Sequence, residues 1–154
     1  MKRKFISIII LLVSILLVAC ANENTTDWKS TKHDVVNNFE GVSMNPKKAS
    51  ISSTELTVIF DNKSDKQVMY SEDILLEKKI DGDWYQVPTI IDDYGFNDIA
   101  YVLPPATKEE LTIDWEWLYG SLDNGEYRIV KTVWNVNDSG GSAEYYLAAQ
   151  FLIE

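Results

Sequence analysis

The feature that most constrains the fold is a succession of short segments in which apolar and polar residues alternate. Three clear examples are 55–61, 108–115 and 143–153. A period of two is that of a β-strand with one buried face. About eight such segments, separated by polar turns and with no convincing helix among them, predict an all-β antiparallel sandwich of about 7–9 strands. The predicted inward side chains are Leu56, Val58 and Phe60, then Leu111, Ile113 and Trp115, then Tyr145, Leu147, Ala149, Phe151 and Ile153.

The strongest local signal is the dipeptide Asp81-Gly82, which separates Leu75 to Ile80 from Asp83 to Val87. A two-residue hairpin turn of type I′ requires positive φ at both central residues, and Asp-Gly is one of the pairs that adopt it. The two runs are therefore predicted to form an antiparallel hairpin, which Pro88 ends.

The first 19 residues have the composition of an export signal. Met1 to Lys4 is basic, Phe5 to Ala19 is apolar apart from two serines, and Cys20 closes the run. A basic start, a short apolar run and small residues at its end are typical of a secretory signal peptide. As a helix the run covers roughly 22 Å, short of a hydrocarbon core of about 30 Å. We therefore predict that residues 1–19 are a signal peptide and not a membrane-spanning helix.

The end of this run, Leu17-Val18-Ala19-Cys20, resembles the bacterial lipobox. The resemblance implies a diacylglycerol in thioether linkage to Cys20, cleavage before it, and acylation of the new amino terminus, for example by palmitate. Two acyl chains are enough for stable membrane attachment. We therefore expect a lipoprotein anchored to the cell membrane, on its extracytoplasmic face, in a Gram-positive type of bacterium.

The acidity of the chain limits its partners. The formal net charge is −10, and loss of Lys2, Arg3 and Lys4 with the signal leaves −13. Such a chain repels phosphate backbones, so we expect no nucleic-acid partner. It also repels anionic lipid, so membrane contact is expected through the anchor alone. Because Cys20 is the only cysteine, no disulfide, thiol catalysis or cysteine metal cluster is expected.

Composition divides the mature chain into a tether and a domain. Residues 20–40 hold the lipidated cysteine and then a polar, aperiodic stretch, which predicts a flexible linker. The only histidine, His33, lies there without an identifiable catalytic or metal-binding neighbour, so we interpret it as a solvated linker residue. Residues 41–154 contain the alternating segments and are predicted to form one domain.

One pair of carboxylates, Asp114 and Glu116, could form an enzyme site. Asp114 and Glu116 are two residues apart, which would place them on one face of a strand, and a glycosidase needs two facing carboxyl groups. The simpler interpretation is that both lie on the solvent face of that strand. No Gly-x-Ser-x-Gly motif is present, and a phosphate-binding loop is absent as well. We therefore predict that the protein is not an enzyme.

A second group of carboxylates lies in one loop. Asp92, Asp93 and Asp98 could supply some of the oxygen ligands that calcium prefers. Their spacing is not that of an EF-hand, so we predict no metal site. The only prosthetic group expected is the diacylglycerol on Cys20.

The irregular stretch from Thr89 to Asn97 is the best candidate for a binding loop. Tyr94 and Phe96 lie in it, and Trp117 lies at a predicted strand end. Loops on a rigid scaffold often carry binding residues, and aromatic faces beside carboxylates suit a sugar or a peptide. The alternative is that this loop covers one end of the sandwich as a lid. Tyr94, Phe96 and Trp117 are the predicted binding residues, with a protein or cell-wall ligand as partner.

Three segments carry a family resemblance: Leu76 to Tyr85, Asp114 to Gly120, and Leu122 to Ile129. In this order they resemble the immunoglobulin-like domain of small surface lipoproteins from Bacillus-type bacteria, over most of the mature chain. The third segment is also similar to the tyrosine corner of fibronectin-type sandwiches, which implies a structural role for Tyr127. The resemblance implies a fold and a surface setting but no shared enzyme activity.

These observations predict a lipid-anchored, non-enzymatic, immunoglobulin-like binding or interaction module. Two alternatives stay open. One is a proteinase-inhibitor-like domain that acts through the loop 89–97. The other is an enzyme that acts on cell-wall glycan through Asp114 and Glu116.

Overall fold

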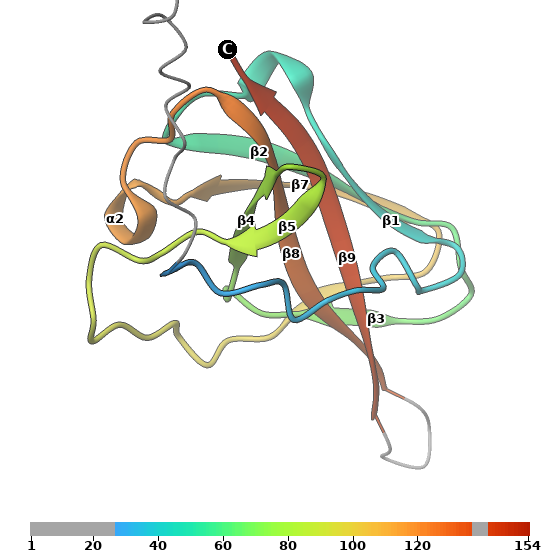
Figure 1. Cartoon of the computed structure of the whole chain (residues 1–154). Coiled ribbons are helices and arrows are strands. Elements are labelled where there is room, and N and C mark those ends of the chain that lie inside the picture. The colour runs from blue at the N-terminus through green and yellow to red at the C-terminus, as the bar shows by residue number, and fades with distance from the viewer. Residues whose placement is uncertain (1–26, 137–141) are drawn as a thin grey trace, which may run out of the picture.

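Two antiparallel sheets pack face to face in the computed structural model, which describes residues 27–136 and 142–154 (Figure 1). The three-stranded sheet has the order β1 (Val42–Pro46), β2 (Glu55–Asn62) and β7 (Thr107–Asp114). The six-stranded sheet contains β5 (Asp83–Gln86), β4 (Leu75–Ile80), β8 (Gly125–Val136), β3 (Val68–Tyr70), β6 (Tyr101–Leu103) and β9 (Ser142–Ile153). This arrangement confirms the predicted all-β sandwich.

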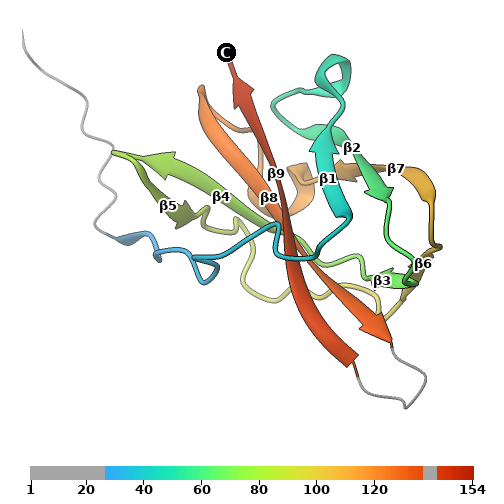
Figure 2. The same cartoon turned by 90° about the vertical axis from the view of Figure 1, so that its right-hand side faces the viewer.

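The long strand β8 organises the larger sheet. Along its full length it pairs with β9, whereas β4 pairs with Tyr127 to Val130 and β3 pairs with Val133 to Asn135. Figure 2 shows the three-stranded sheet on one side of the β8–β9 pair, with β4 and β5 on the other.

The alternating segments place their apolar residues between the sheets, as predicted. Leu56, Val58 and Phe60 of β2 are fully buried, and so is Trp115 just after β7. Burial of this kind stabilises a fold by roughly 1.5–3 kcal/mol per large side chain. The predicted inward residues of β9 also belong to this core or pack against it: Tyr145, Leu147, Ala149, Phe151 and Ile153.

Two local predictions are confirmed by backbone and side-chain geometry. Asp81 and Gly82 have φ values of 53° and 97°, as a type I′ turn between β4 and β5 requires. The hydroxyl of Tyr127 donates a hydrogen bond of 3.0 Å to the carbonyl oxygen of Asp123, which forms a tyrosine corner.

Short elements connect the longer strands. β1 runs through Pro46 and is followed by a 3₁₀ turn, η2 (Lys48–Ser50). β6 has three residues. After β7 the chain forms one helical turn, α2 (Glu116–Tyr119). The cause of this turn is Trp115, which is fully buried and donates from Nε1 to the carbonyl of Ser53.

The segment 27–40 is not a loose tether in the structure. Its backbone adds to the free edge of β5: Thr31 N donates to the Trp84 carbonyl, and Gln86 N donates to the Lys29 carbonyl. Phe39, at its end, is buried in the core. The expectation of a flexible linker therefore does not describe residues 28–39.

A buried ion pair holds this segment in place. Arg128 Nε lies 2.6 Å from Glu77 Oε2, with both side chains almost fully buried on opposed positions of β8 and β4. The same guanidinium donates to Thr31 Oγ1 and to the carbonyl of His33, both at 3.1 Å. His33 is half-buried and its ring lies 4.2 Å from that of Tyr146, so it is not the solvated residue expected.

Two predictions fall outside the described residues. They are the signal peptide 1–19 and the lipid site Cys20. Among residues 27–136 and 142–154, the helices are all too short to cross a membrane.

Candidate functional site

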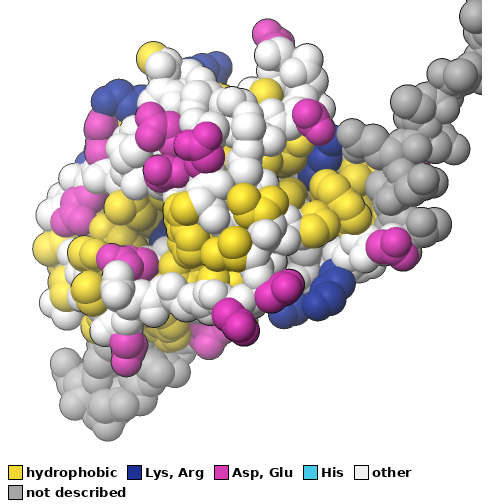
Figure 3. Space-filling view, turned by 90° about the vertical axis from the view of Figure 1, so that its left-hand side faces the viewer, with side chains coloured by type: hydrophobic (Ala, Val, Ile, Leu, Met, Phe, Trp, Pro, Cys, Tyr) yellow, Lys and Arg dark blue, Asp and Glu magenta, His cyan; other side chains and the backbone are white. Residues whose placement is uncertain are grey.

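Exposed apolar side chains are concentrated on one side of the molecule. Of the nine large hydrophobic residues that are exposed in the described part of the chain, seven come from the β5–β6 connection, from β6 or from α2. Figure 3 shows apolar side chains gathered in the middle of this side, with carboxylates around them. We call six of them the apolar face: Ile90, Ile91, Tyr94, Ile99, Tyr101 and Trp117. Val102 is not included, because it is next to Tyr101 on β6 and points to the opposite face of that sheet.

The three aromatic residues predicted to bind a ligand lie together on this side. The Phe96 ring meets Tyr94 and Trp117 edge to face, at centroid distances of 6.0 and 5.8 Å. Tyr94 and Trp117 are 46% and 45% exposed, whereas Phe96 packs against the core. The loop therefore covers the end of the sandwich with Phe96 and presents the other two rings to solvent. A binding role for the three remains a prediction.

Hydrogen bonds hold this loop on the domain. Ile90 N donates to the Leu118 carbonyl at 2.8 Å. At the other end, the Glu72 carboxylate accepts from Asn97 Nδ2 at 2.8 Å and from the Tyr101 hydroxyl at 2.9 Å. These two bonds hold the pKa of Glu72 below its usual value, so the carboxylate stays charged. The loop is thus fixed at both ends.

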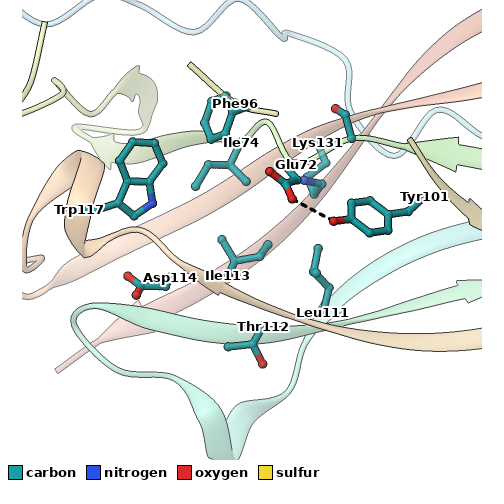
Figure 4. Close-up of a pocket in the computed structure, with 11 residues that line it drawn as sticks. Glu72, Ile74, Phe96, Tyr101, Leu111, Thr112, Ile113, Asp114, Trp117 and Lys131 are labelled. Atoms are coloured by element: carbon teal, nitrogen blue, oxygen red, sulfur yellow. Dashed lines mark hydrogen bonds between the residues drawn. The ribbon is translucent and has the colours of Figure 1, made fainter. Parts of the chain in front are cut away.

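Beside the aromatic cluster the sandwich is open between its two sheets. A hollow of about 230 Å³ lies there. Leu111 and Ile113 point into it from β7, and Ile74, just before β4, faces them (Figure 4). Trp117 and Phe96 close one end, and the Glu72–Tyr101 pair stands at the other (Figure 4).

Lys131 is the least expected residue of the hollow. It lies on β8 between the core residues Ile129 and Val133, on the same face, and is only 1% exposed. Its ammonium group donates to the Asp73 carbonyl at 2.8 Å. Burial lowers the pKa of Lys131 to about 8. The nearby hydroxyl of Ser71 is buried without a hydrogen-bond partner among the described residues.

The proposed glycosidase pair does not have the expected geometry. Asp114 is the last residue of β7, and Glu116 is the first of α2, so they do not share a strand face. Instead, Asp114 Oδ1 accepts a hydrogen bond from the backbone N–H of Glu116. The prediction that both carboxylates lie on one face of a strand is wrong, because β7 ends at Asp114 and the buried Trp115 separates it from α2.

The carboxylates of the loop are exposed and spread along it. Asp92, Asp93 and Asp98 are all exposed. Within the described ranges, no three Asp, Glu, His or Cys side chains converge closely enough to hold a metal ion.

Three residues of the hollow were not predicted from the sequence: Ser71, Glu72 and Lys131. Only Lys131 left a signal: it interrupts the apolar alternation of Tyr127, Ile129 and Val133. A charged residue at an inward position marks a site that needs explanation. Glu72 and Ser71 lie in a short connection without periodicity, and only the fold brings them to β6 and β7.

Comparison with known proteins gives a fold family. A search of the curated proteins found no match. Among solved structures, the chain is similar to the ASH / PapD-like domain of human CEP192 (PapD-like domain 7), at 13% identity and a TM-score of 0.34. That likeness covers 80% of this chain and 98% of the other. The family model of the bacterial Ig-like domain matches residues 38–152.

This match spans the described sandwich from the buried Phe39 almost to the end of β9. The chain therefore belongs to the bacterial Ig-like domain family.

Proposed function

We propose that this protein is a membrane-anchored, extracytoplasmic lipoprotein whose Ig-like domain is a non-enzymatic interaction module. The observation that carries the proposal is the apolar face, whose large apolar side chains are exposed to solvent on a side of the domain that also carries carboxylates. Exposed patches of this kind, rimmed by polar residues, mark interaction surfaces.

The composition of the apolar face supports a protein or cell-wall partner. Tyr94 and Trp117 are aromatic, half-exposed and supported from beneath by Phe96. Aromatic residues of this type are enriched among the side chains that dominate binding energy at interfaces. Because the loop is fixed at both ends, little ordering entropy opposes binding.

The test of this surface compares matched variants of the full chain in a pull-down from the native cell envelope. Tyr94→Ala together with Trp117→Ala is expected to remove at least nine-tenths of the specifically captured material. Leu152→Ala, which changes an exposed apolar residue of β9, serves as the control and is expected to capture normally. Equal capture by both variants would show that the apolar face is not the binding surface.

The anchor rests on the lipobox resemblance at Cys20. We expect metabolic labelling with a fatty-acid analogue to mark the wild-type chain, and Cys20→Ala to abolish the label, since the thioether has no other cysteine on which to form. Labelling that persists in Cys20→Ala contradicts the anchor.

A second candidate is a proteinase-inhibitor-like role for the loop 89–97. The exposure of Ile90 and Ile91 favours it, because an inhibitory loop must present side chains to a protease cleft. Titration of envelope proteases with the purified chain tests this idea. Stoichiometric loss of protease activity supports it, and full residual activity removes it.

A further inference from the structure

We infer that the free edge of β7 accepts an added strand: an extended, lysine- or arginine-bearing segment of a partner protein, whose alternate apolar side chains enter the hollow. The inference rests on the proposed function and names the class of partner that the interaction module takes.

The backbone of β7 is unpaired on one side. In the described part of the chain, β2 is the only strand that pairs with it. Thr57 of β2 directs both its backbone groups away from β7: its N–H donates to Ser50 Oγ at 2.7 Å, and its carbonyl accepts from Lys47 N at 2.8 Å. Thr57 is opposite Thr112, so this is a non-hydrogen-bonded pair of the antiparallel ladder.

It follows that Thr112 also points its N–H and carbonyl away from β2, toward the opening beside the hollow. The alternation of the ladder gives the same orientation to Glu110, which is opposite Ile59. These groups form a row of donors and acceptors, which is the template that strand addition uses.

Two other sheet edges in the described part are covered over some of their length. Lys29 and Thr31 occupy the edge of β5. On β9, the Tyr146 carbonyl accepts from Asn37 N, and the N–H groups of Tyr146 and Ala148 donate to the side-chain oxygens of Asn38 and Asn37. Covering a strand edge with a loop is a common means of preventing unwanted pairing. Among residues 27–136 and 142–154, no backbone bond covers the edge of β7 next to the hollow.

The hollow determines which side chains the added strand needs. Residues opposite Leu111 and Ile113 would point to the same face of the sheet, and this face is the wall of the hollow (Figure 4). Two residues of the added strand, spaced by two, would therefore enter the hollow beside Leu111 and Ile113. Lys131 and Ser71 line the same hollow and offer donors to a carbonyl oxygen.

The charge around the hollow determines which side chains of the added strand can face solvent. Glu72 and Asp114 line the opening, and Glu116 and Asp98 are exposed nearby on α2 and the loop. The only Lys or Arg among the residues that line the hollow is Lys131, which is buried. The side chains of the added strand that face solvent are therefore expected to be basic, and binding is expected to weaken as salt increases.

The test uses the full chain in mild detergent and a blocked nonapeptide in which valine and lysine alternate. Thr112→Pro removes the outward N–H without removing a bond to β2, and proline is tolerated on edge strands at such positions. Thr112→Ala keeps the N–H and is the matched control. Circular dichroism and thermal unfolding check that both variants fold.

The expected result is that Thr112→Pro binds the peptide at least tenfold more weakly than Thr112→Ala. The peptide should also slow deuterium uptake by residues 107–114 in wild type and Thr112→Ala but not in Thr112→Pro. A peptide that alternates valine and glutamate should bind at least tenfold more weakly than the lysine peptide.

Equal binding by the two variants would overturn the inference, and so would equal binding of the two peptides. Dimerisation of the chain alone, lost in Thr112→Pro, would also overturn it, because the occupant would then be a second copy. If Tyr94→Ala with Trp117→Ala loses envelope capture while Thr112→Pro captures normally, strand addition is wrong and the proposed function stands. If neither variant loses capture, the proposed function itself fails.

Discussion

Lys131 places an ammonium group between the two sheets, where burial lowers its pKa to about 8. The unfolded chain keeps the ordinary lysine pKa of about 10.4. Between these values the unfolded state binds more protons than the folded state, so stability rises with pH. Below about pH 8 both states are protonated, and the cost of the buried charge is constant. The residue thus weakens the fold at neutral pH.

Lys131→Met should therefore stabilise the protein by about 1–3 kcal/mol at pH 7, since replacing a buried charge by an apolar side chain of similar shape is often stabilising. Urea unfolding of the wild type should show a rise in stability from pH 8 to pH 9.5, and the variant should show a smaller one. Burial raises the pKa of Tyr70 and Tyr119 to about 12, so their opposing effect begins only near pH 10.

The control for this change is Lys48→Met, at an exposed lysine, which should leave the free energy of unfolding almost unchanged. A Lys131→Met variant that is less stable than wild type at pH 7 contradicts the account of the buried ammonium group.

Tyr127 gives the second residue-scale prediction. Tyr127→Phe removes the hydrogen bond to the Asp123 carbonyl and keeps the ring beside Phe151. A net loss of about 1 kcal/mol in the free energy of unfolding is expected. Tyr94→Phe, at an exposed ring, is the control and should be neutral. If both variants unfold at the same urea concentration as wild type, the tyrosine corner does not stabilise this fold.

At the scale of elements, the segment 28–38 acts as an extra edge of the larger sheet. Thr31 pairs with Trp84 and accepts from Arg128, whose guanidinium lies 4.5 Å from the Trp84 ring centroid. Without this segment, the buried pair of Glu77 and Arg128 would lose its cover and part of its hydrogen bonding. The linker is therefore a structural part of the domain.

Deletion of residues 28–38 should lower the free energy of unfolding by about 2–4 kcal/mol, because a handful of hydrogen bonds at about 1 kcal/mol each are lost. Thermal unfolding of the deleted and complete chains measures the difference. Val35→Ala, at an exposed position of the same segment, should be neutral. Unchanged stability after the deletion would mean that the docked segment contributes nothing to the fold.

Local chemistry explains which elements the sequence could predict. Alternation identified β2, β7 and β9, and Asp81-Gly82 identified the β4–β5 hairpin, since both signals lie within a few residues. The position of the segment 28–38 depends on contacts between residues that are far apart in the sequence. An example is the hydrogen bond from Arg128 to Thr31, which are 97 positions apart. A polar, aperiodic segment carries no sign of such a partner, so it was predicted to be flexible.

The candidate site was predictable in its aromatic part and not in its polar part. Tyr94, Phe96 and Trp117 were noticed because large aromatic residues in an irregular loop are unusual, and the fold brings them together. Glu72 and Ser71 became part of the hollow only through the pairing of β3 with β6 and β8. Side chains that are brought into a site only by the sheet topology leave no local pattern in the sequence.

At the scale of the whole molecule, the point where the described chain begins lies beside the apolar face. Asp27 and Trp28 line the same surface hollow as Pro88 and Tyr94. Between Cys20 and Trp28 the chain can span at most about 26–29 Å, at roughly 3.3–3.6 Å per residue. On the proposed anchor, the apolar face would therefore lie close to the membrane surface, and the partner would be a protein or wall component in that layer.

The central claim is that the apolar face touches a partner, and site-specific photo-cross-linking in intact cells tests it most directly. A photoreactive phenylalanine derivative at position 117 is compared with the same group at position 152, since both Trp117 and Leu152 are about half exposed. We predict a discrete cross-linked product from position 117 and none from position 152. No product from position 117, or the same products from both positions, would contradict the account.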